Sequence, residues 1–302
     1  MQPSPPSADD AAPRPRRRVL LAGVVAAVVL AGAAVTVIVV RANRHSATTC
    51  ALPAVASGPR VSAAQAPDGG QLRVVETGFS QLPTPNFILA PDVVIGAVVE
   101  NTSTQVAYHT RVRFEMRDAA GKVVPDKAKK SVLVQEIPVI LPGEQVPVGA
   151  SAELVEDLDF TVNLPKVASV HVTPETTLWV IQPATEARFA AVNAAPTQVT
   201  PYDLNKTADQ RSIKITWALT SDYCKPVTNI GAVLLYRSDA GTLLGGVGRA
   251  RGANDPDQCQ PGVSTWFTGV YGLPDGTDPA RTQVYQYCDP GAPQNPAATV
   301  QP

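Results

Sequence analysis

The hydrophobic pattern of the chain has two parts: one long apolar run near the N-terminus and, beyond it, short alternating segments. The run extends over residues 19–40 and holds 22 residues without a charge. A helix needs about 20 apolar residues to cross the hydrocarbon core of a bilayer, so the run predicts a transmembrane helix. Four arginines precede it within residues 14–18, and two, Arg41 and Arg44, follow it closely. This balance places the N-terminus in the cytoplasm and everything beyond about residue 42 outside.

A cleaved signal peptide is the alternative for the same segment. Ala31, Gly32 and Ala33 supply small residues of the kind that a signal peptidase accepts. The apolar run continues past them to Val40, whereas the hydrophobic core of a signal peptide usually has about 7 to 15 residues. We therefore expect an uncleaved anchor.

After the anchor, segments rich in Val, Thr and Ile alternate with turns such as Asp118–Gly121 and Leu141–Glu144. This pattern predicts antiparallel β-strands. In the first half of the chain we expect strands over Leu72–Leu82, Asp92–Val99, Tyr108–Met116, Lys122–Val134, Val146–Leu154 and Val167–Ile181.

Strict alternation predicts which side chains of two strands face a core. In the first strand the core face comprises Tyr108, Thr110, Val112, Phe114 and Met116, and the outer face comprises His109, Arg111, Arg113 and Glu115. In the second strand the core face comprises Ile213, Ile215, Trp217 and Leu219, with Lys214 and Thr216 outward.

The pattern repeats with an offset of 120 residues. Residues 101–124 align with residues 221–244 without a gap, so that Arg117 falls on Arg237. Solenoid repeats are about 20 to 50 residues long, so this period indicates two whole domains.

The predicted fold is therefore an all-β ectodomain of two tandem antiparallel sandwiches that follow one N-terminal transmembrane helix. The expected parts are a Pro- and Arg-rich cytoplasmic tail (1–18), the transmembrane helix (19–41), an extracytoplasmic linker (42–70), the first sandwich (71–183), a second linker (184–207), the second sandwich (208–290) and a disordered tail (291–302).

The charge of the ectodomain argues against nucleic acid as a partner. Beyond residue 41 there are 20 basic and 24 acidic residues, and no large basic block stands among them. Binding to a phosphate backbone needs a concentration of Lys and Arg that this composition lacks.

All of the cysteines, Cys50, Cys224, Cys259 and Cys288, lie beyond the anchor, where two disulfides are the default. An up-and-down path of strands gathers the last three at one end of the second sandwich. We expect Cys224 to pair with Cys259 and Cys50 with Cys288; the alternative is that Cys50 joins two chains as a dimer. Neither a CxxC motif nor a Cys–His pair at ligand spacing is present, so no zinc site is predicted.

A family resemblance rests on a strand, a polar Asn-Thr-Ser turn, a second strand that ends in Arg-Asp-Ala-Ala-Gly and a Leu-Pro-Gly-Glu turn. These features resemble the immunoglobulin-like sandwiches of single-pass bacterial envelope proteins, including FxLYD-type domains, over residues 71–183 and 208–290. Where FxLYD domains have Phe-x-Leu-Tyr-Asp, the copies here have residues 114–118 (Phe-Glu-Met-Arg-Asp) and 234–239 (Leu-Leu-Tyr-Arg-Ser-Asp). The Ala, Val, Pro and Arg richness suggests an actinobacterial source. The resemblance implies a fold and an envelope location but no active site.

One strand carries a candidate ligand face. His109, Arg111, Arg113 and, just past the strand, Arg117 form a small basic patch that would bind an anionic ligand such as a wall polymer. The alternative is an ordinary solvated face, with Glu115 as a cross-strand partner.

Other sites are weaker. The acidic loops at residues 254–257 and 275–278 offer oxygen ligands for calcium, but the same residues also form turns, and an up-and-down path puts the loops at opposite ends of the domain. The sequence lacks the serine-hydrolase, zinc-protease and phosphate-loop motifs, so we predict no cofactor, no metal and no enzyme; an enzyme of unrecognised type is a remote alternative.

The sequence thus favours a non-catalytic, membrane-anchored extracytoplasmic protein that binds or scaffolds an envelope protein or wall polymer. The rival is a sensory or regulatory subunit that signals through its transmembrane helix. The short cytoplasmic tail has no domain of its own, which argues against a self-contained receptor.

Overall fold

The structure is a computed structural model that describes residues 50–53, 66, 68–82, 91–154, 164–176, 178–181, 188–202, 211–251 and 255–291. The described strands all belong to one compact unit, residues 51–302. The expected cytoplasmic tail, the expected transmembrane helix, most of the first linker and residues 292–302 lie outside the described residues. Within the part that the structure describes, no helix has both the length and the apolar character needed to span a bilayer.

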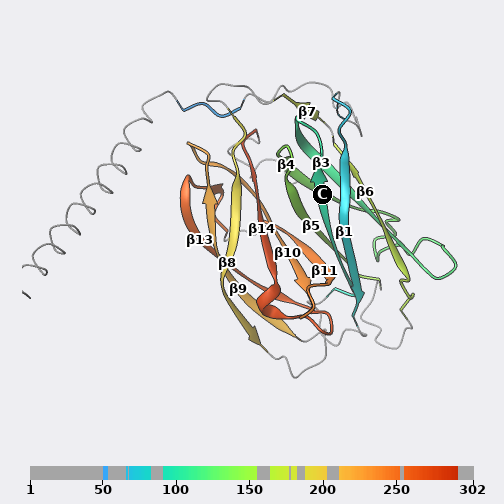
Figure 1. Ribbon diagram of the computed structural model, residues 1–302. Coiled ribbons are helices and arrows are strands. Elements are labelled where there is room, and N and C mark those ends of the chain that lie inside the picture. The colour runs from blue at the N-terminus through green and yellow to red at the C-terminus, as the bar shows by residue number, and fades with distance from the viewer. Residues whose placement is uncertain are drawn as a thin grey trace, which may run out of the picture. The chain divides into compact units, whose positions relative to one another are not determined.

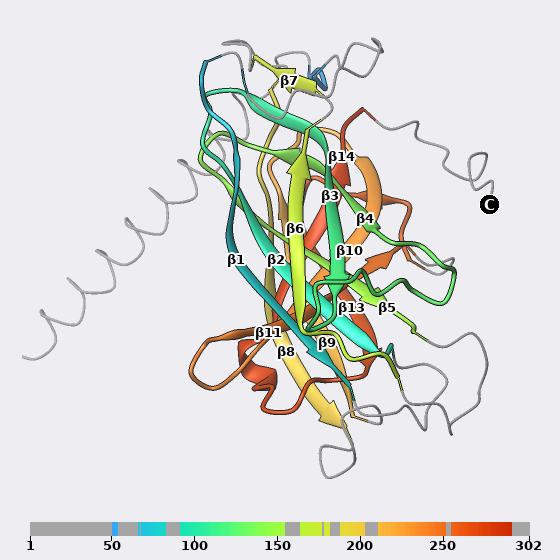
Figure 2. The same ribbon diagram turned by 90° about the vertical axis from the view of Figure 1, so that its right-hand side faces the viewer.

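The described strands form four antiparallel sheets (Figures 1 and 2). The first half of the chain supplies a first inner sheet, with the order β1-β2-β5, and a first outer sheet, with the order β4-β3-β6 and the short β7 also paired to β3. Their bounds are β1 (Leu72–Gln81), β2 (Val93–Asn101), β3 (Val106–Arg117), β4 (Leu133–Ile140), β5 (Gln145–Ala152), β6 (Ser169–Glu175) and β7 (Leu178–Val180).

The second half supplies a second inner sheet, in which β10 pairs with β11, β12 and β14, and a second outer sheet, with the order β13-β9-β8. Their bounds are β8 (Val192–Tyr202), β9 (Ser212–Ser221), β10 (Val227–Arg237), β11 (Leu243–Ala250), β12 (Gln258–Cys259), β13 (Gly262–Tyr271) and β14 (Gln283–Asp289), with a short 3₁₀ helix, η1 (Pro279–Arg281), before β14.

The two halves have the same strand order. The sheet β13-β9-β8 corresponds to β5-β2-β1, and β11-β10-β14 corresponds to β4-β3-β6. The offset seen in the sequence is also present: β2 ends at Asn101 and β9 at Ser221, while β3 ends at Arg117 and β10 at Arg237. Each half thus contains an inner and an outer antiparallel sheet, an arrangement consistent with a β-sandwich.

The predicted register of the two strands is confirmed. Val112, Phe114 and Met116 are buried in the core of the first sandwich, and Phe114 has no exposed surface. The core of the second sandwich contains the four predicted residues of β9, Ile213, Ile215, Trp217 and Leu219. Tyr108 is also buried, but it packs with Val106 and Phe189 in a separate small cluster.

Glycines allow the two inner sheets to pack directly against each other. Strand β11 crosses the first inner sheet, and three pairs of residues meet there: Leu243 with Gly78 of β1, Gly245 with Gly96 of β2, and Val247 with Gly149 of β5. A Cβ atom on Gly78 would lie 2.0 Å from the Leu243 carbonyl oxygen, and one on Gly149 would lie 2.8 Å from the backbone of Val247. A side chain at either position would force the sheets apart.

Strand β8 is a difference from the sequence prediction. It occupies Val192–Tyr202, within the segment 184–207 that was expected to be a linker, and pairs along its length with β9. Its two prolines, Pro196 and Pro201, weaken the sequence signal for a strand. They are compatible with β8 because it lies at the edge of its sheet, where half of the backbone N–H groups need no partner.

Candidate functional site

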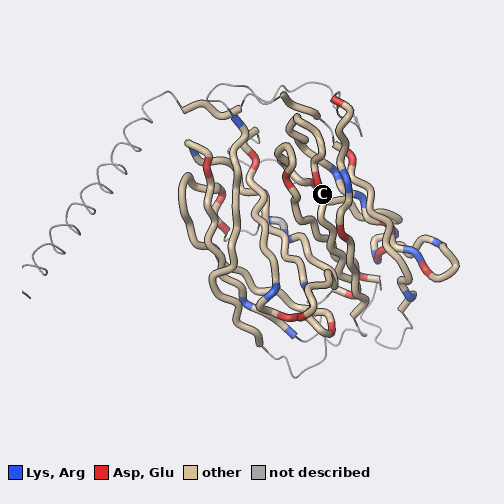
Figure 3. The backbone as a smooth tube through the Cα atoms, viewed as in Figure 1, with Lys and Arg blue, Asp and Glu red and all other residues tan. Residues whose placement is uncertain are grey.

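The predicted basic face lies on the outside of the first outer sheet, but acidic residues accompany it. Strand pairing places Arg111 between Glu136 of β4 and Glu175 of β6, and Arg111 Nε lies 3.8 Å from a Glu136 carboxylate oxygen. Arg117 donates from Nε to Glu115 at 2.7 Å. Figure 3 shows both signs of charge close together in the region of β3 and β6. The face is therefore a mixture of charges rather than a positive patch.

Arg113 differs from its neighbours. It is exposed and lies opposite Val134 of β4 and Thr173 of β6. No ion pair of Arg113 is seen among the described residues. It is the member of the predicted patch that remains open to an anion.

His109 points to carboxylates rather than to solvent. It has a φ of 53°, and it interrupts the pairing of β3 with β4 between Tyr108 and Thr110. Its Nδ1 lies 2.5 Å from Glu136 Oε1, and its Nε2 lies 3.1 Å from Asp289 Oδ2 at the end of β14. The left-handed conformation turns the ring toward the second sandwich, so His109 connects the two halves.

Asp289 is the buried centre of this connection. Its side chain is 2 % exposed, and its Oδ1 accepts hydrogen bonds from the Tyr108 hydroxyl at 2.7 Å and from the Gly291 N–H at 2.8 Å. Burial alone would raise the pKa of Asp289, but the hydrogen bonds from His109, Tyr108 and Gly291 outweigh it and lower that pKa. Asp289 is therefore a carboxylate at neutral pH.

His109 is held in its charged form by the same contacts. Burial opposes its protonation, but the hydrogen bonds to Asp289 and Glu136 outweigh burial and raise the pKa of His109 to about 9. A charged imidazolium between two carboxylates is a structural clamp, since its proton is not available to a substrate near neutral pH. The cluster thus connects residues of the two sandwiches.

A large open groove lies beside the contact between the inner sheets. Its volume is about 1010 Å³, at the upper limit of the usual size of ligand sites, and both sandwiches line it. The first sandwich contributes Val75, Glu76, Val98, Glu144, Gln145 and Pro147; the second contributes Asn193–Pro196, Arg237 and residues 280–285. The walls therefore mix apolar, amide and charged side chains. A second cavity, of about 20 Å³, has room for little more than one water molecule.

Direct contacts between the sandwiches fix the walls of the groove. Arg237 of β10 donates to both carboxylate oxygens of Glu76 in β1, at 2.7 and 2.6 Å. This pairing lowers the pKa of Glu76. The Tyr285 hydroxyl donates to Glu144 at 2.8 Å, and the Tyr287 hydroxyl donates to the Pro147 carbonyl at 2.7 Å.

Aspartates of both acidic loops form ion pairs with arginines. Asp255 lies 2.6 Å from Arg249, and Asp257 pairs with Arg251. At the other end of β13, Asp275 lies 2.7 Å from Arg211. In the part of the chain that the structure describes, no group of at least three His, Cys, Asp or Glu side chains could hold a metal ion.

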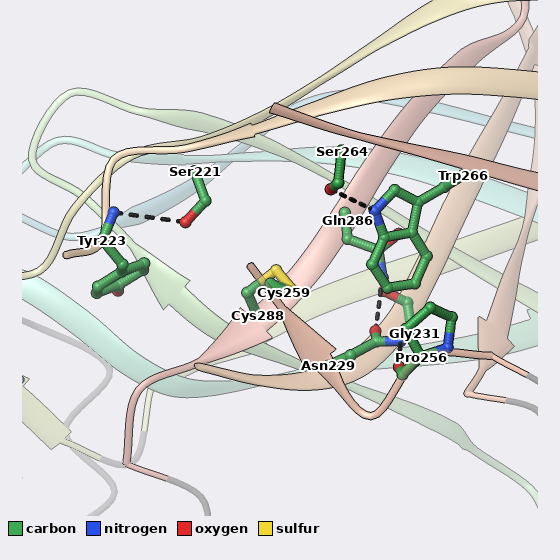
Figure 4. The surroundings of a disulfide bond; sticks show 10 residues. All are labelled: Ser221, Tyr223, Asn229, Gly231, Pro256, Cys259, Ser264, Trp266, Gln286 and Cys288. Atoms are coloured by element: carbon green, nitrogen blue, oxygen red, sulfur yellow. Dashed lines mark hydrogen bonds between the residues drawn. A yellow bond between two sulfur atoms is a disulfide. The ribbon is translucent and has the colours of Figure 1, made fainter. Parts of the chain in front are cut away.

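The disulfide pairing differs from the prediction. Cys259 bonds to Cys288, with 6.2 Å between their Cα atoms (Figure 4). The expected pairs Cys224–Cys259 and Cys50–Cys288 are therefore both wrong. Strand pairing explains the choice, because β10 has Cys259 opposite Val227 and Cys288 opposite Asn229, near the same end of the strand.

The other two cysteines, Cys50 and Cys224, are disulfide-bonded as well, and no cysteine of the chain is free. No thiol remains for a bridge between two chains, so the alternative in which Cys50 forms a dimer is also wrong. The expectation that Cys224, Cys259 and Cys288 gather at one end of the second sandwich agrees with the strand path, because β9 ends and β10 begins on either side of Cys224.

The second outer sheet carries an exposed apolar surface that was not among the predicted sites. Phe267 and Val263 of β13 are 66 % and 74 % exposed, and Tyr271 and Tyr202 are 41 % and 47 % exposed. The alternation of β13, in which Trp266 and Val270 are buried, is the signal that could have located it. Among these strands Lys214 is the only charged residue.

Comparison with known proteins gives no further guide to the function. No protein-family model matches the chain, and no curated protein sequence is significantly similar to it.

Proposed function

We propose that this chain is a non-catalytic, membrane-anchored protein whose immunoglobulin-like sandwiches bind a component of the cell envelope outside the membrane. The anchor is the apolar segment 19–40, and the arginines before it direct the sandwiches outward. Disulfides support an extracytoplasmic location because they persist in oxidising compartments.

The groove between the sandwiches is the observation that carries the proposal. A binding protein needs a concave surface with a few fixed polar groups in a mostly preformed arrangement. The Arg237–Glu76 pair, the Tyr285–Glu144 hydrogen bond and the glycine contacts of β11 hold its two walls in one relation. A groove that does not have to form on binding avoids the cost of ordering its walls.

Photo-crosslinking in cells tests this role. A photoreactive amino acid at Ala195, which is exposed in the groove wall, is compared in the full chain with the same amino acid at Lys122, which is exposed in a turn of the first sandwich. We expect a light-dependent adduct with an envelope component at Ala195 and none at Lys122. An absence of adduct at Ala195, or equal adducts at both sites, would contradict the proposal.

A deletion of residues 2–13 separates this role from signalling through the membrane. The deletion keeps the arginines of residues 14–18 and the apolar segment, so the orientation should not change. A binding or scaffolding protein should form the Ala195 adduct and complement a null mutant as the intact chain does. An unchanged adduct with lost complementation would favour the sensory or regulatory alternative.

A further inference from the structure

The outward face of the second outer sheet has a composition that is unusual for a protein surface. It presents Val263, Phe267, Tyr271 and Tyr202, and Lys214 is the only charged residue in the three strands. An exposed apolar surface of this kind marks an interaction site in a soluble domain. Figure 1 shows β13, β9 and β8 on the side of the molecule opposite the first outer sheet, so neither inner sheet covers this face.

The register of the strands arranges these side chains in rows. Tyr271 lies opposite Ser212 of β9, and Ser212 lies opposite Tyr202 of β8, so the two tyrosines flank one row. They are about 10 Å apart, or two strand spacings. Phe267 lies about 13 Å along β13 from Tyr271, at four residues of roughly 3.3 Å each. The aromatic residues therefore stand at three separate points of the sheet surface.

Hydrogen-bonding groups and a glycine fill the space between the rings. Thr216 and Gln198 share the row of Phe267, and Lys214 and Thr200 share the row of Gly269. A Cβ atom on Gly269 would meet nothing closer than 4.0 Å, so the surface between Phe267 and Tyr271 is open. A ligand can lie close to the backbone there.

Lys214 gives this face a positive charge, and no ion pair of Lys214 with a carboxylate is seen among the described residues. Its ammonium lies 5.1 Å from the centroid of the Phe267 ring. No acidic residue belongs to any of the three strands. The contact with the ring holds the cation at the surface, where it complements an anion.

We propose that this face binds an anionic polysaccharide. The apolar faces of sugar rings would stack on Phe267, Tyr271 and Tyr202, the sugar hydroxyls would bond to the threonine and glutamine side chains, and an acidic group would pair with Lys214. This inference rests on the proposed envelope function and adds the class of ligand. The proposed anion site is therefore on the second outer sheet and not on strand β3, where carboxylates already accompany Arg111 and Arg117.

A protein partner fits this surface less well. The centre of a protein interface is a continuous, densely packed apolar patch. Here rows of hydroxyl and amide groups separate the exposed rings, an arrangement that suits a ligand with alternating apolar faces and hydroxyls. A second copy of the chain is the competing occupant that the test must detect.

The test measures binding of the full chain, in detergent micelles, to immobilised polygalacturonate and to the neutral glucan dextran. Three variants are compared: a Phe267→Ser/Tyr271→Ser double variant, Lys214→Gln, and Val134→Ser as the control. Val134 is a matched control because it is also an exposed apolar residue, 51 % accessible, on the outside of an outer sheet.

We expect the double variant to bind polygalacturonate at least about tenfold more weakly, since two stacking contacts are lost. Lys214→Gln should weaken binding to polygalacturonate but not to dextran, and Val134→Ser should bind as the unmodified chain does. No binding of polygalacturonate by the intact chain, or equal binding by all variants, would overturn the inference. The same holds if light scattering shows that the double variant only converts a dimer to a monomer.

The outcome can be separated from that of the groove experiment. A persistent adduct at Ala195 together with absent polysaccharide binding would overturn the polysaccharide site and leave the envelope function standing. Loss of both would remove the envelope function and this inference together.

Discussion

The two outer sheets are not equivalent in the repeat, and their outward surfaces differ. By strand order, β4-β3-β6 corresponds to the second inner sheet, and β13-β9-β8 corresponds to the first inner sheet. The first presents His109, Arg111 and Glu136 in mutual contact, whereas the second presents aromatic and hydroxyl groups around the single charge of Lys214. A strand with several arginines suggests an anion site when it is considered alone. Once β4 and β6 pair with it, its charges are largely balanced. The surface with large exposed rings is the other one.

The contrast is confined to the outward faces, because both sheets bury the same kind of core. Phe114 of the first outer sheet and Trp217 of the second are each at most 1 % exposed. The outward face of the first outer sheet carries ion pairs, each of which contributes little to stability. The outward face of the second outer sheet leaves large aromatic rings partly exposed to water. The two halves therefore turn different sheets of the repeated strand order outward, and their surfaces differ although both sheets bury large apolar side chains.

The largest expected effect tests whether the two cores are equivalent. Phe114→Ala and Trp217→Ala should each lower the free energy of unfolding by about 3 to 5 kcal/mol, because each leaves a cavity in a packed core. Denaturant unfolding followed by fluorescence or circular dichroism measures this. Losses that differ between the two variants by more than about 2 kcal/mol would show that the sandwiches are not equivalent, beyond the usual spread of core substitutions.

A smaller loss of stability should distinguish a glycine of an inner sheet from a glycine of an outer sheet. Gly78→Ala should destabilise the protein by about 1 to 3 kcal/mol, because its Cβ atom would meet the Leu243 carbonyl oxygen at 2.0 Å. Gly269→Ala on the second outer sheet is the matched control, since its Cβ atom would meet nothing closer than 4.0 Å. It should leave stability unchanged or raise it by less than about 1 kcal/mol. Similar melting temperatures for the two variants would contradict the close packing of β11 on the first inner sheet.

The last expected effect is a pH dependence of stability that the first outer sheet should show and the second should not. The pKa of His109 is raised from 6.5 in an exposed residue to about 9, so the folded state binds the proton more tightly than the unfolded state. Its stabilising contribution is complete below pH 6.5 and is lost as the pH rises through about 9. Stability should therefore fall between these values.

His109→Gln should flatten that fall, whereas Lys214→Gln on the neutral sheet should leave it intact. Unfolding in urea at a series of pH values between 6 and 10 provides the measurement. A pH profile that is the same in His109→Gln and in the intact chain would show that the imidazolium does not clamp Asp289 to the first sandwich.

Much of the β architecture could be predicted because alternation is a local property. The inward face of β3 follows from the period of Val112, Phe114 and Met116, and that of β9 from Ile213, Ile215 and Trp217. The alternating direction of successive strands in the second half was also predictable, but not that β9 and β10, or β13 and β14, lie in different sheets. Strand β8 was missed because its two prolines resemble those of a linker.

The candidate sites could be predicted only in part. The cysteines of the second sandwich were placed at the correct end, but the pairing of Cys259 with Cys288 depends on where β12 and β14 meet β10. The contact of His109 with Asp289 joins residues 180 positions apart across two sandwiches. The continuous apolar run of β2, buried on both faces, was the available signal that another sheet covers the first inner sheet.

By itself the sequence determined which side chains of its clearest strands point inward, that the strand pattern occurs twice, and that a long apolar segment precedes both copies. These properties depend on neighbours within a few residues. Only the tertiary structure decided which carboxylates approach the arginines of β3, which cysteines bond, and that glycines bring two sheets into contact. The reason is physical: these interactions depend on the register and packing of strands far apart in the chain, which no single strand's alternation contains.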